Sequence, residues 1–244
     1  MRTPAHIITY GETDNALVHI TNANFYEQKE KVVGMQAKVR VNGERGNLLV
    51  KGSVGRTQLL PLAAAIAVAQ ALLIPLAEAI KALETYESPP GRSRLLEGKN
   101  TSIIIDDSYN ASPAAVEEAL TTLRTFPHAK RRIAVLGDML ELGRYSVMEH
   151  ERIGALIDSS ADIIVTVGIR ARAFARALTH TEILQFENAH AAATVLTDLV
   201  RAGDIILVKG SQSIRMERIV EALLADPTVV SRLVRQEREW KRKA

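Results

Sequence analysis

The chain contains no cysteine, which excludes disulfide bridges and thiolate metal sites. Aromatic residues make up only 4% of its 244 residues, so a hydrophobic core has to consist mainly of alanine, leucine, isoleucine and valine. The longest apolar stretch, residues 59–74, contains Pro61 and Gln70 and is too short to span a bilayer comfortably. Residues 1–20 lack the apolar core of a signal peptide. We therefore expect a cytoplasmic protein that has no membrane partner.

Two glycine-rich phosphate-binding signatures are also absent from the sequence. There is no G-x-x-x-x-G-K-[ST], the P-loop whose backbone amides and lysine cradle a triphosphate, and there is no G-x-G-x-x-G. The six histidines are scattered without the spacing of a metal site, so no metal ligands are predicted.

Positive charge is concentrated near the end of the chain. The net charge is +3 and the sequence pI is about 9.2, but the excess of lysine and arginine lies between residues 232 and 243. We expect a basic terminal helix or tail over residues 226–244, exposed to solvent; a tail that binds nucleic acid or a membrane surface is the alternative. The rest of the chain is close to neutral, so we predict no nucleic-acid partner.

The first part of the chain has the pattern of antiparallel strands followed by helices. Short segments of period-two alternation are separated by glycines or by Asn42-Gly43, which indicates hairpins. Helical composition follows over residues 58–74 and 75–85. The clearest interruption is Ser88-Pro89-Pro90-Gly91, and we place a domain boundary there. The expected strands cover residues 6–10, 16–20, 32–41 and 47–50.

Beyond this boundary strands and helices alternate. Continuous apolar strands that are each followed by a helix indicate an α/β, Rossmann-like domain, whose mainly parallel sheet is covered on both faces. In such sheets ligands bind beyond the carboxyl ends of the strands, so the residues that follow each strand are the candidates for a site. The expected strands cover residues 103–105, 133–136, 163–167 and 205–208, and the expected helices begin near residues 112, 148, 171, 189 and 216.

Charged residues follow the first and the last of these strands. Asp106 and Asp107 are neighbours on a strand and point to opposite faces, so at most one of them faces a cleft. A carboxylate there commonly accepts hydrogen bonds from ribose hydroxyls, and a helix or turn cap is an equally good interpretation. The string Lys209-Gly210-Ser211 combines a cation, a glycine that permits close backbone approach and a hydroxyl before a helix. This combination fits an anion, either a phosphate or a substrate carboxylate.

The loop over residues 137–143 follows another strand and holds Asp138 and Glu141. Because carboxylates recognise ammonium groups, this loop is suited to orient an amine-bearing substrate; a turn with a helix-capping aspartate is the alternative. Arg92 follows the domain boundary and is suited to clamp a phosphate, although an exposed linker arginine is the commoner outcome. His150 is interpreted as a surface or packing residue. The residues alone predict a two-domain α/β protein with a cleft for a nucleotide or an anionic substrate.

Several strings of the second part occur in the order of those in a known family. They are DDSYNASP at residues 106–113, RIAVLGDMLELG at 132–143, Glu149-His150 and VKGS at 208–211, preceded by Pro90-Gly91-Arg92. Together they resemble the Mur ligases, and within them the branch that adds D-alanyl-D-alanine to the UDP-muramoyl tripeptide. The resemblance is strong over residues 88–225. Residues 5–87 weakly resemble the latter part of the family's central domain.

The resemblance implies an ATP-dependent ligase of peptidoglycan synthesis. Such enzymes have a UDP-sugar domain, a central ATPase domain with a P-loop, and a C-terminal domain that closes over the nucleotide. With ATP and Mg²⁺ they convert a substrate carboxylate into an acyl phosphate, and an amine attacks it to give the amide, ADP and phosphate. The implied domains are a partial central domain without the P-loop at residues 1–87, a C-terminal ligase domain at 88–225, and the basic tail at 226–244.

In this chain the resemblance assigns roles to the strand-end residues. Arg92 is expected to reach the nucleotide phosphates or ribose and, together with Lys209, to take part in catalysis. Asp107 is expected to hold the ribose hydroxyls, with Tyr109 and Asn110 beside the base. The residues expected near the incoming dipeptide are Asp138, Glu141, Lys209, Gly210 and Ser211.

One string of the first part departs from the family. The family reads Gly-Arg-His-Asn-x-x-Asn before the alanine-rich helix, with the last asparagine at the adenine. Here Thr57 replaces the histidine and Pro61 replaces that asparagine, so the amide donor to the adenine is lost. The expected partners are ATP or ADP, D-alanyl-D-alanine and the UDP-muramoyl tripeptide.

The P-loop, the Mg²⁺ ligands and the UDP-sugar domain are expected before residue 1 or on a separate chain. Because most of the charge stabilisation for phosphoryl transfer comes from such a triphosphate cradle, we expect no ligase activity from this chain alone. The alternative function is a degenerate Mur-like module that binds a nucleotide or a dipeptide without ligase activity.

Overall fold

The structure is a computed structural model that describes residues 7–242. The chain divides between Ser88 and Pro89 into two compact units, called unit 1 and unit 2. None of the helices in the described part of the chain is long and apolar enough to cross a membrane.

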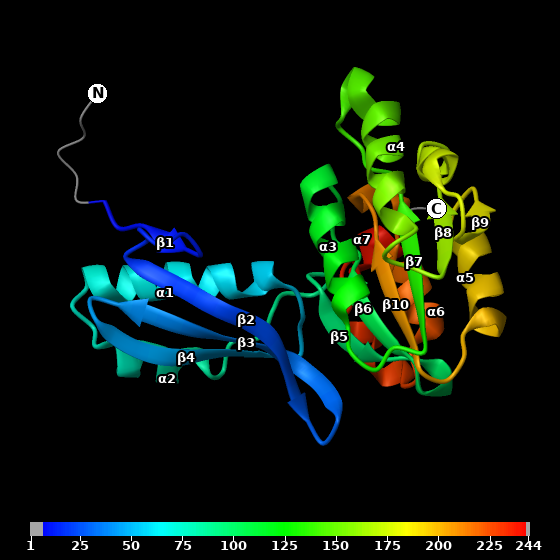
Figure 1. The fold of residues 1–244 in the computed structure, drawn as a ribbon. Helices are drawn as coiled ribbons and strands as arrows, with labels where there is room; N and C mark the ends of the chain where they lie inside the picture. The colour runs from blue at the N-terminus through cyan, green and yellow to red at the C-terminus, as the bar shows by residue number, and fades with distance from the viewer. Residues whose placement is uncertain (1–6, 243–244) are drawn as a thin grey trace. The chain divides into compact units, whose positions relative to one another are not determined.

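Unit 1 is a four-stranded sheet with two helices on one face (Figure 1). The strands lie side by side in chain order; β1 and β2 are parallel, and the other two neighbouring pairs are antiparallel. Asn42-Gly43 joins β3 to β4, and both residues have the positive φ (49° and 88°) that this two-residue turn requires. The strands are β1 (Tyr10–Gly11), β2 (Val18–Gln28), β3 (Lys31–Val41) and β4 (Glu44–Lys51).

The two helices of unit 1 cover the apolar face of this sheet. After a short 3₁₀ turn, η1 (Arg56–Leu59), helix α1 (Leu60–Ala71) packs on β1 and β2, and α2 (Leu76–Leu83) packs on β4. Buried and exposed residues alternate along β3, so that Ala37 and Val39 lie in the core while Lys38 and Arg40 lie on the opposite face. The strands predicted over residues 16–20, 32–41 and 47–50 and the two predicted helices are confirmed. Of the strand predicted over residues 6–10 only Tyr10 lies in a strand, β1, which is parallel to β2; residue 6 lies outside the described residues.

Unit 2 contains a six-stranded sheet in the order β5-β6-β10-β7-β8-β9. Every neighbouring pair is parallel except β5 and β6. The central strands are almost completely buried, as expected for strands covered on both faces. The mainly parallel α/β sheet predicted from the sequence is therefore confirmed. The strands are β5 (Arg94–Glu97), β6 (Ile103–Asp107), β7 (Arg131–Gly137), β8 (Ile163–Val167), β9 (Glu182–Phe186) and β10 (Asp204–Lys209).

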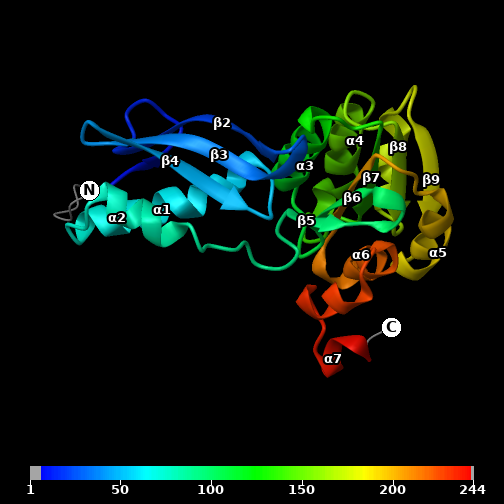
Figure 2. The same cartoon turned by 90° about the horizontal axis from the view of Figure 1, so that it is seen from below.

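Helices cover both faces of this sheet (Figure 2). On one face α3 packs on β7 and β10 and touches α4; on the other face α5 and α6 pack together over Ile104, Val135 and Ile206. The segment expected to be a helix from residue 171 is the 3₁₀ helix η4 (Ala171–Ala177). The helices are α3 (Pro113–Thr125), α4 (Ser146–Ile157), α5 (Ala189–Leu199) and α6 (Glu217–Leu223).

The C-terminal segment, residues 226–242, differs from the solvent-exposed helix that its charge predicted. It begins with the 3₁₀ helix η6 (Pro227–Arg232), and its only α-helix, α7, covers Arg238–Lys241. Between them Leu233, Val234 and Arg235 are buried, and Leu233 belongs to the core beside α5 and α6. The apolar residues among the charged ones give this segment a face that packs on unit 2, which net charge alone does not reveal.

Candidate functional site

The polar residues that follow the strands of unit 2 gather at one edge of the sheet. Lys209, the last residue of β10, is in register with Asp107 of β6 and with Leu136 of β7. Gly137, which ends β7, is in register with Val167 at the end of β8. Because these strands are parallel and end together, the loops that follow them emerge side by side.

Asp107 and Lys209 form a buried ion pair at this edge. Lys209 Nζ lies 2.6 Å from Asp107 Oδ2 and donates a second hydrogen bond, of 3.0 Å, to the backbone oxygen of Asn110. Asp107 Oδ1 accepts from the backbone N–H of Ser93 at 3.2 Å. The side chains of Lys209 and Asp107 are only 3% and 10% exposed. The resemblance assigned Asp107 to ribose hydroxyls and Lys209 to catalysis, whereas here each neutralises the other away from solvent.

Asp106 points to the opposite face of β6 and is fully buried. Its Oδ1 accepts hydrogen bonds from Ser108 Oγ at 2.6 Å and from the Ser108 N–H at 3.2 Å, while its Oδ2 has no hydrogen-bond partner. Burial raises the pKa of Asp106 from 3.8 to about 6, against the opposing effect of the hydrogen bonds from Ser108. Of the two adjacent acids, Asp106 is therefore the one that caps a turn.

The loop after β6 presents polar groups to solvent. Tyr109 is 39% exposed, and the guanidinium carbon of Arg92 lies 4.2 Å from the centre of its ring, a cation–π contact. Asn110 is exposed, and its Oδ1 accepts from the N–H of Ala111 at 2.9 Å. Arg92, Tyr109 and Asn110, all predicted to contact the nucleotide, are thus brought together on an accessible surface.

Ser211 connects the loop after β10 to the loop after β7. Its N–H donates to the backbone oxygen of Asp138 at 3.0 Å, and its Oγ accepts from the N–H of Leu140 at 2.8 Å. Gly210 lies directly against Gly137: a Cβ at Gly210 would be 3.0 Å from the Gly137 Cα. The glycine thus permits the two strand ends to approach each other closely.

The carboxylate of Asp138 is buried and points away from solvent. Its Oδ1 accepts from the N–H of Ala171 at 2.7 Å, at the beginning of η4. This is the capping role that was the alternative to amine recognition. Gly168 is required beside it, since a Cβ at that position would lie 2.4 Å from Asp138 Oδ1.

His150 packs against the loop over residues 137–143; of the two roles expected from the sequence, a surface or a packing residue, it has the second. It is fully buried; its Nε2 accepts from the N–H of Met139 at 3.0 Å, and its Nδ1 donates to the backbone oxygen of Ser146 at 2.6 Å. Burial lowers the pKa of His150, which favours the neutral ring that this pair of hydrogen bonds requires.

An open hollow of about 450 Å³ lies where three of these loops meet. Asn110, Glu141 and Ser211 each contribute to its lining from a different loop. A carboxylate, an amide and hydroxyls can together bind a small zwitterion, because they accept from an ammonium group and donate to a carboxylate. We call it the strand-end hollow; its other polar lining residues are Ser112, Gln212, Ser213 and Trp240.

These other lining residues were not predicted from the sequence. Gln212 and Ser213 directly follow the predicted Lys209-Gly210-Ser211 string, so extending that string would have found them. Trp240 is the only tryptophan of the chain and stands within the basic segment that was expected to be solvated. A lone tryptophan in such a segment was the available signal that the segment packs.

A buried cluster of Arg215, Glu217 and Arg235 fixes the C-terminal segment beside the hollow. Glu217 lies 2.5 Å from Arg215 Nε and 2.9 Å from Arg235 Nη1. Arg235 donates to the backbone oxygens of Ser108 at 3.2 Å and Tyr109 at 2.6 Å. Since Arg215 Nη1 also donates to the Trp240 oxygen at 2.6 Å, the cluster holds both the Tyr109 loop and Trp240 in place.

Neither a metal site nor the family's adenine-binding string is found intact. Over residues 7–242 no group of three or more histidine or acidic side chains is arranged to hold a metal ion. In unit 1 Arg56 is paired with Glu12, and Pro61 lies in the first turn of α1, where a missing N–H is tolerated.

Comparison with known proteins identifies the family. The family model described as "Mur ligase, glutamate ligase domain" matches residues 91–212, which is half of the chain. A UDP-N-acetylmuramoyl-tripeptide–D-alanyl-D-alanine ligase from Synechocystis sp. is 31% identical over 233 residues, covering 89% of this chain and 50% of the relative. The ligase of the same name from Escherichia coli is 34% identical over 155 residues, covering 62% of this chain and 33% of the relative.

Solved structures agree with this result. The MurF ligase from Thermotoga maritima in complex with ADP superimposes with a TM-score of 0.73 at 26% identity, covering 86% of this chain and 46% of that protein. The chain thus spans about half the length of the relatives that it matches over most of its own length. By its matched domain and its similarity to these relatives, the chain belongs to the Mur ligase family.

Proposed function

We propose that the chain is the part of an ATP-dependent Mur ligase that presents D-alanyl-D-alanine to a UDP-muramoyl tripeptide during synthesis of a peptidoglycan precursor. The names of its relatives support this substrate pair. The observation that carries the proposal is the strand-end hollow, which collects acceptors and donors from three loops at the carboxyl edge of a parallel sheet.

In this proposal the hollow holds the dipeptide. The exposed carboxylate of Glu141 accepts from its ammonium group, while Asn110 and the exposed Gln212 and Ser213 supply donors and acceptors for its peptide bond and carboxylate. Ser211 contributes from the buried wall, where its hydroxyl already accepts from Leu140. The amine must lose a proton before it attacks, so its contact with Glu141 belongs to the binding step.

The nucleotide is assigned to the adjacent surface that carries Arg92 and Tyr109. The Thermotoga maritima relative is known with ADP, which supports nucleotide binding by this family. Arg92 can leave the Tyr109 ring to contact a phosphate, because nothing but the cation–π contact is found for its guanidinium within residues 7–242. We assign Asp107 and Lys209 a positioning role: Lys209 holds the Asn110 backbone, and both are buried.

The phosphoryl-transfer step needs groups that the described residues do not form. ATP would phosphorylate the tripeptide carboxylate, releasing ADP, and the dipeptide amine would displace phosphate from the acyl phosphate to form the amide. The sequence contains no P-loop, and in this proposal other sequence, on the same or on a separate polypeptide, supplies the P-loop and most of the ligands for Mg²⁺. Since ATP is the cosubstrate, we place this function in the cytoplasm.

A titration of D-alanyl-D-alanine into the chain tests the role of the hollow. We expect saturable binding that Glu141→Gln weakens at least about tenfold, because a charge-assisted hydrogen bond to the ammonium group is replaced by a neutral one. Glu182→Gln is the matched control, since Glu182 is exposed and lies at the opposite end of the same sheet. Equal binding by the wild type and Glu141→Gln would contradict the assignment.

A phosphate-release assay distinguishes a part of a working ligase from a module that binds its ligand without ligase activity. The chain alone, given ATP, Mg²⁺, tripeptide and dipeptide, is expected to release no phosphate above background. Addition of a Mur ligase fragment that carries the P-loop and UDP-sugar domains is expected to restore dipeptide-dependent release. Dipeptide binding with no release in the combined reaction would favour the binding module.

A further inference from the structure

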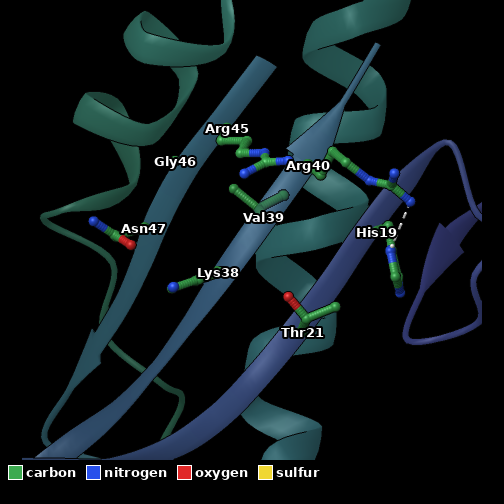
Figure 3. Close-up of a pocket in the computed structure, with 8 residues that line it drawn as sticks. All are labelled: His19, Thr21, Lys38, Val39, Arg40, Arg45, Gly46 and Asn47. Carbon is green, nitrogen blue, oxygen red and sulfur yellow. Dashed lines mark hydrogen bonds between the residues drawn. The ribbon is translucent and has the colours of Figure 1, made fainter. Parts of the chain in front are cut away.

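Unit 1 carries a second hollow, of about 460 Å³, on the face of its sheet that the helices do not cover. Figure 3 shows its lining residues, which come from β2, β3 and β4. We call it the basic hollow; it is defined by His19, Thr21, Lys38, Arg40, Arg45 and Asn47.

The basic hollow is built from two neighbouring cross-strand rows. In one row Arg40 of β3 is in register with His19 of β2 and Arg45 of β4. In the other row Lys38 is in register with Thr21 and Asn47. Directly opposed residues on one face have their Cβ atoms about 5 Å apart, and alternate residues along a strand are about 7 Å apart. The spacing of Lys38, Arg40 and Arg45 is therefore about the length of two linked phosphate groups.

Three cations give this surface its charge; the carboxylate of Asp14 lies beside it, with its Oδ1 3.6 Å from His19 Nε2. Lys38, Arg40 and Arg45 are exposed, and no ion pair to a carboxylate is found for them in the part of the chain that the structure describes. Arg40 and Arg45 are directly opposed, and like charges in that position destabilise a sheet. The repulsion between these two guanidinium groups in the free protein decreases when an anion binds between them.

His19 holds one of these arginines in place. Its ring is buried, and its Nδ1 lies 3.2 Å from Arg40 Nη2, as the dashed line in Figure 3 marks. Its Nε2 lies 3.3 Å from the backbone oxygen of Glu12, so Nε2 carries the proton and Nδ1 is the acceptor. The guanidinium of Arg40 is thus oriented before any ligand arrives, which lowers the entropy lost on binding.

We propose that the basic hollow is a binding site for a diphosphate group, either the free ion or the diphosphate of a nucleotide. Three cations match the charge of a diphosphate, whereas a single carboxylate would leave two of them uncompensated. The Asn47 amide and the Thr21 hydroxyl supply further donors for the phosphate oxygens. This site lies in unit 1 and shares no residue with the strand-end hollow of unit 2.

Calorimetric titration of the whole chain tests the proposal with inorganic diphosphate and inorganic phosphate as probes. We expect one diphosphate to bind about tenfold or more tightly than phosphate. Arg45→Gln is expected to weaken diphosphate binding about tenfold and, since it removes the repulsion from Arg40, to leave the melting temperature of the free chain unchanged or higher. Lys31→Gln removes a cation of β3 that lies outside the hollow; it is the control and is expected to change binding less than about twofold.

Two additional measurements locate the binding site and show whether its ligand is free diphosphate or a nucleoside diphosphate. The amide signals of residues 19–21, 38–40 and 45–47 are expected to shift on addition of diphosphate, and those of unit 2 are not. ADP and uridine diphosphate as further probes, followed by the same amide signals of unit 1, show whether a nucleoside adds affinity to the diphosphate at this site. The proposal is overturned if diphosphate does not saturate the chain, if Lys31→Gln weakens binding as much as Arg45→Gln, or if a single-stranded oligonucleotide binds this face more tightly than either diphosphate form.

Discussion

At the scale of single residues, Asp106 combines complete burial with an oxygen that has no partner. Its folded-state pKa of about 6 exceeds the value of 3.8 expected in the unfolded chain. Between these values the folded state binds more protons, so the contribution of Asp106 to stability falls as the pH rises from about 4 to about 6 and stays low above that. Two pKa units correspond to about 3 kcal/mol.

Asp106→Asn removes this titration while keeping an acceptor for Ser108. Urea unfolding of both proteins at pH 4.5 and 7.5 should therefore show the wild type losing about 2 kcal/mol relative to the variant as the pH rises. Parallel pH profiles for the two proteins would show that the carboxyl group does not titrate as its burial requires.

The buried pair of Lys209 and Asp107 gives a second residue-scale prediction. Lys209→Met leaves the Asp107 carboxylate buried without a counter-charge, which should reduce the free energy of unfolding by about 3 to 5 kcal/mol. Adding Asp107→Asn removes that charge, so the double variant should be more stable than Lys209→Met alone. A double-mutant cycle in urea measures the coupling, and strictly additive effects would mean that the two charges do not interact.

The positions of these residues could be predicted from the sequence, but their partners could not. Apolar runs indicated where the strands end, and therefore that Asp107 and Lys209 lie at one edge of a sheet. That their strands are neighbours depends on the strand order, which inserts β10 between β6 and β7 from a distant part of the chain. No local pattern contains that information.

At the scale of elements, the strands of unit 2 that could be predicted from the sequence are the buried ones. The central strands of unit 2 are continuous apolar runs because both of their faces are covered. β5 and β9 form the two edges of the sheet; they are short and partly exposed, and neither was predicted. β2 continues to Gln28 through a polar stretch, because that part of the hairpin is exposed and needs no apolar pattern.

The C-terminal segment provides the element-scale prediction. Glu217→Gln leaves Arg215 and Arg235 buried without their shared carboxylate, so the segment should detach and unfolding should require about 3 to 5 kcal/mol less free energy. Trp240 is the only tryptophan, so its fluorescence reports on this segment alone and should shift to longer wavelength. Glu239→Gln, an exposed change within α7, is the control and should leave the emission unchanged. An unshifted spectrum in Glu217→Gln would show that the cluster does not hold the segment.

At the scale of the whole molecule, the two units carry different kinds of polar surface. Unit 2 presents a hollow of mixed donors and acceptors at strand ends, and unit 1 presents three cations on an open sheet. The position of the hollow in unit 2 could be predicted from the sequence, because ligands bind beyond the carboxyl ends of the strands in parallel sheets. The basic hollow of unit 1 depends on the register of three antiparallel strands, which aligns Arg40 with Arg45. Composition alone does not specify that register.

The central claim is that the strand-end hollow of unit 2 binds the dipeptide. Backbone amide chemical-shift mapping with D-alanyl-D-alanine tests it most directly. We expect shifts that saturate together at residues 110–112, 140–142 and 211–213 and at the indole N–H of Trp240, with unit 1 unaffected. A dipeptide that leaves these signals in place, or that shifts a different surface, would contradict it.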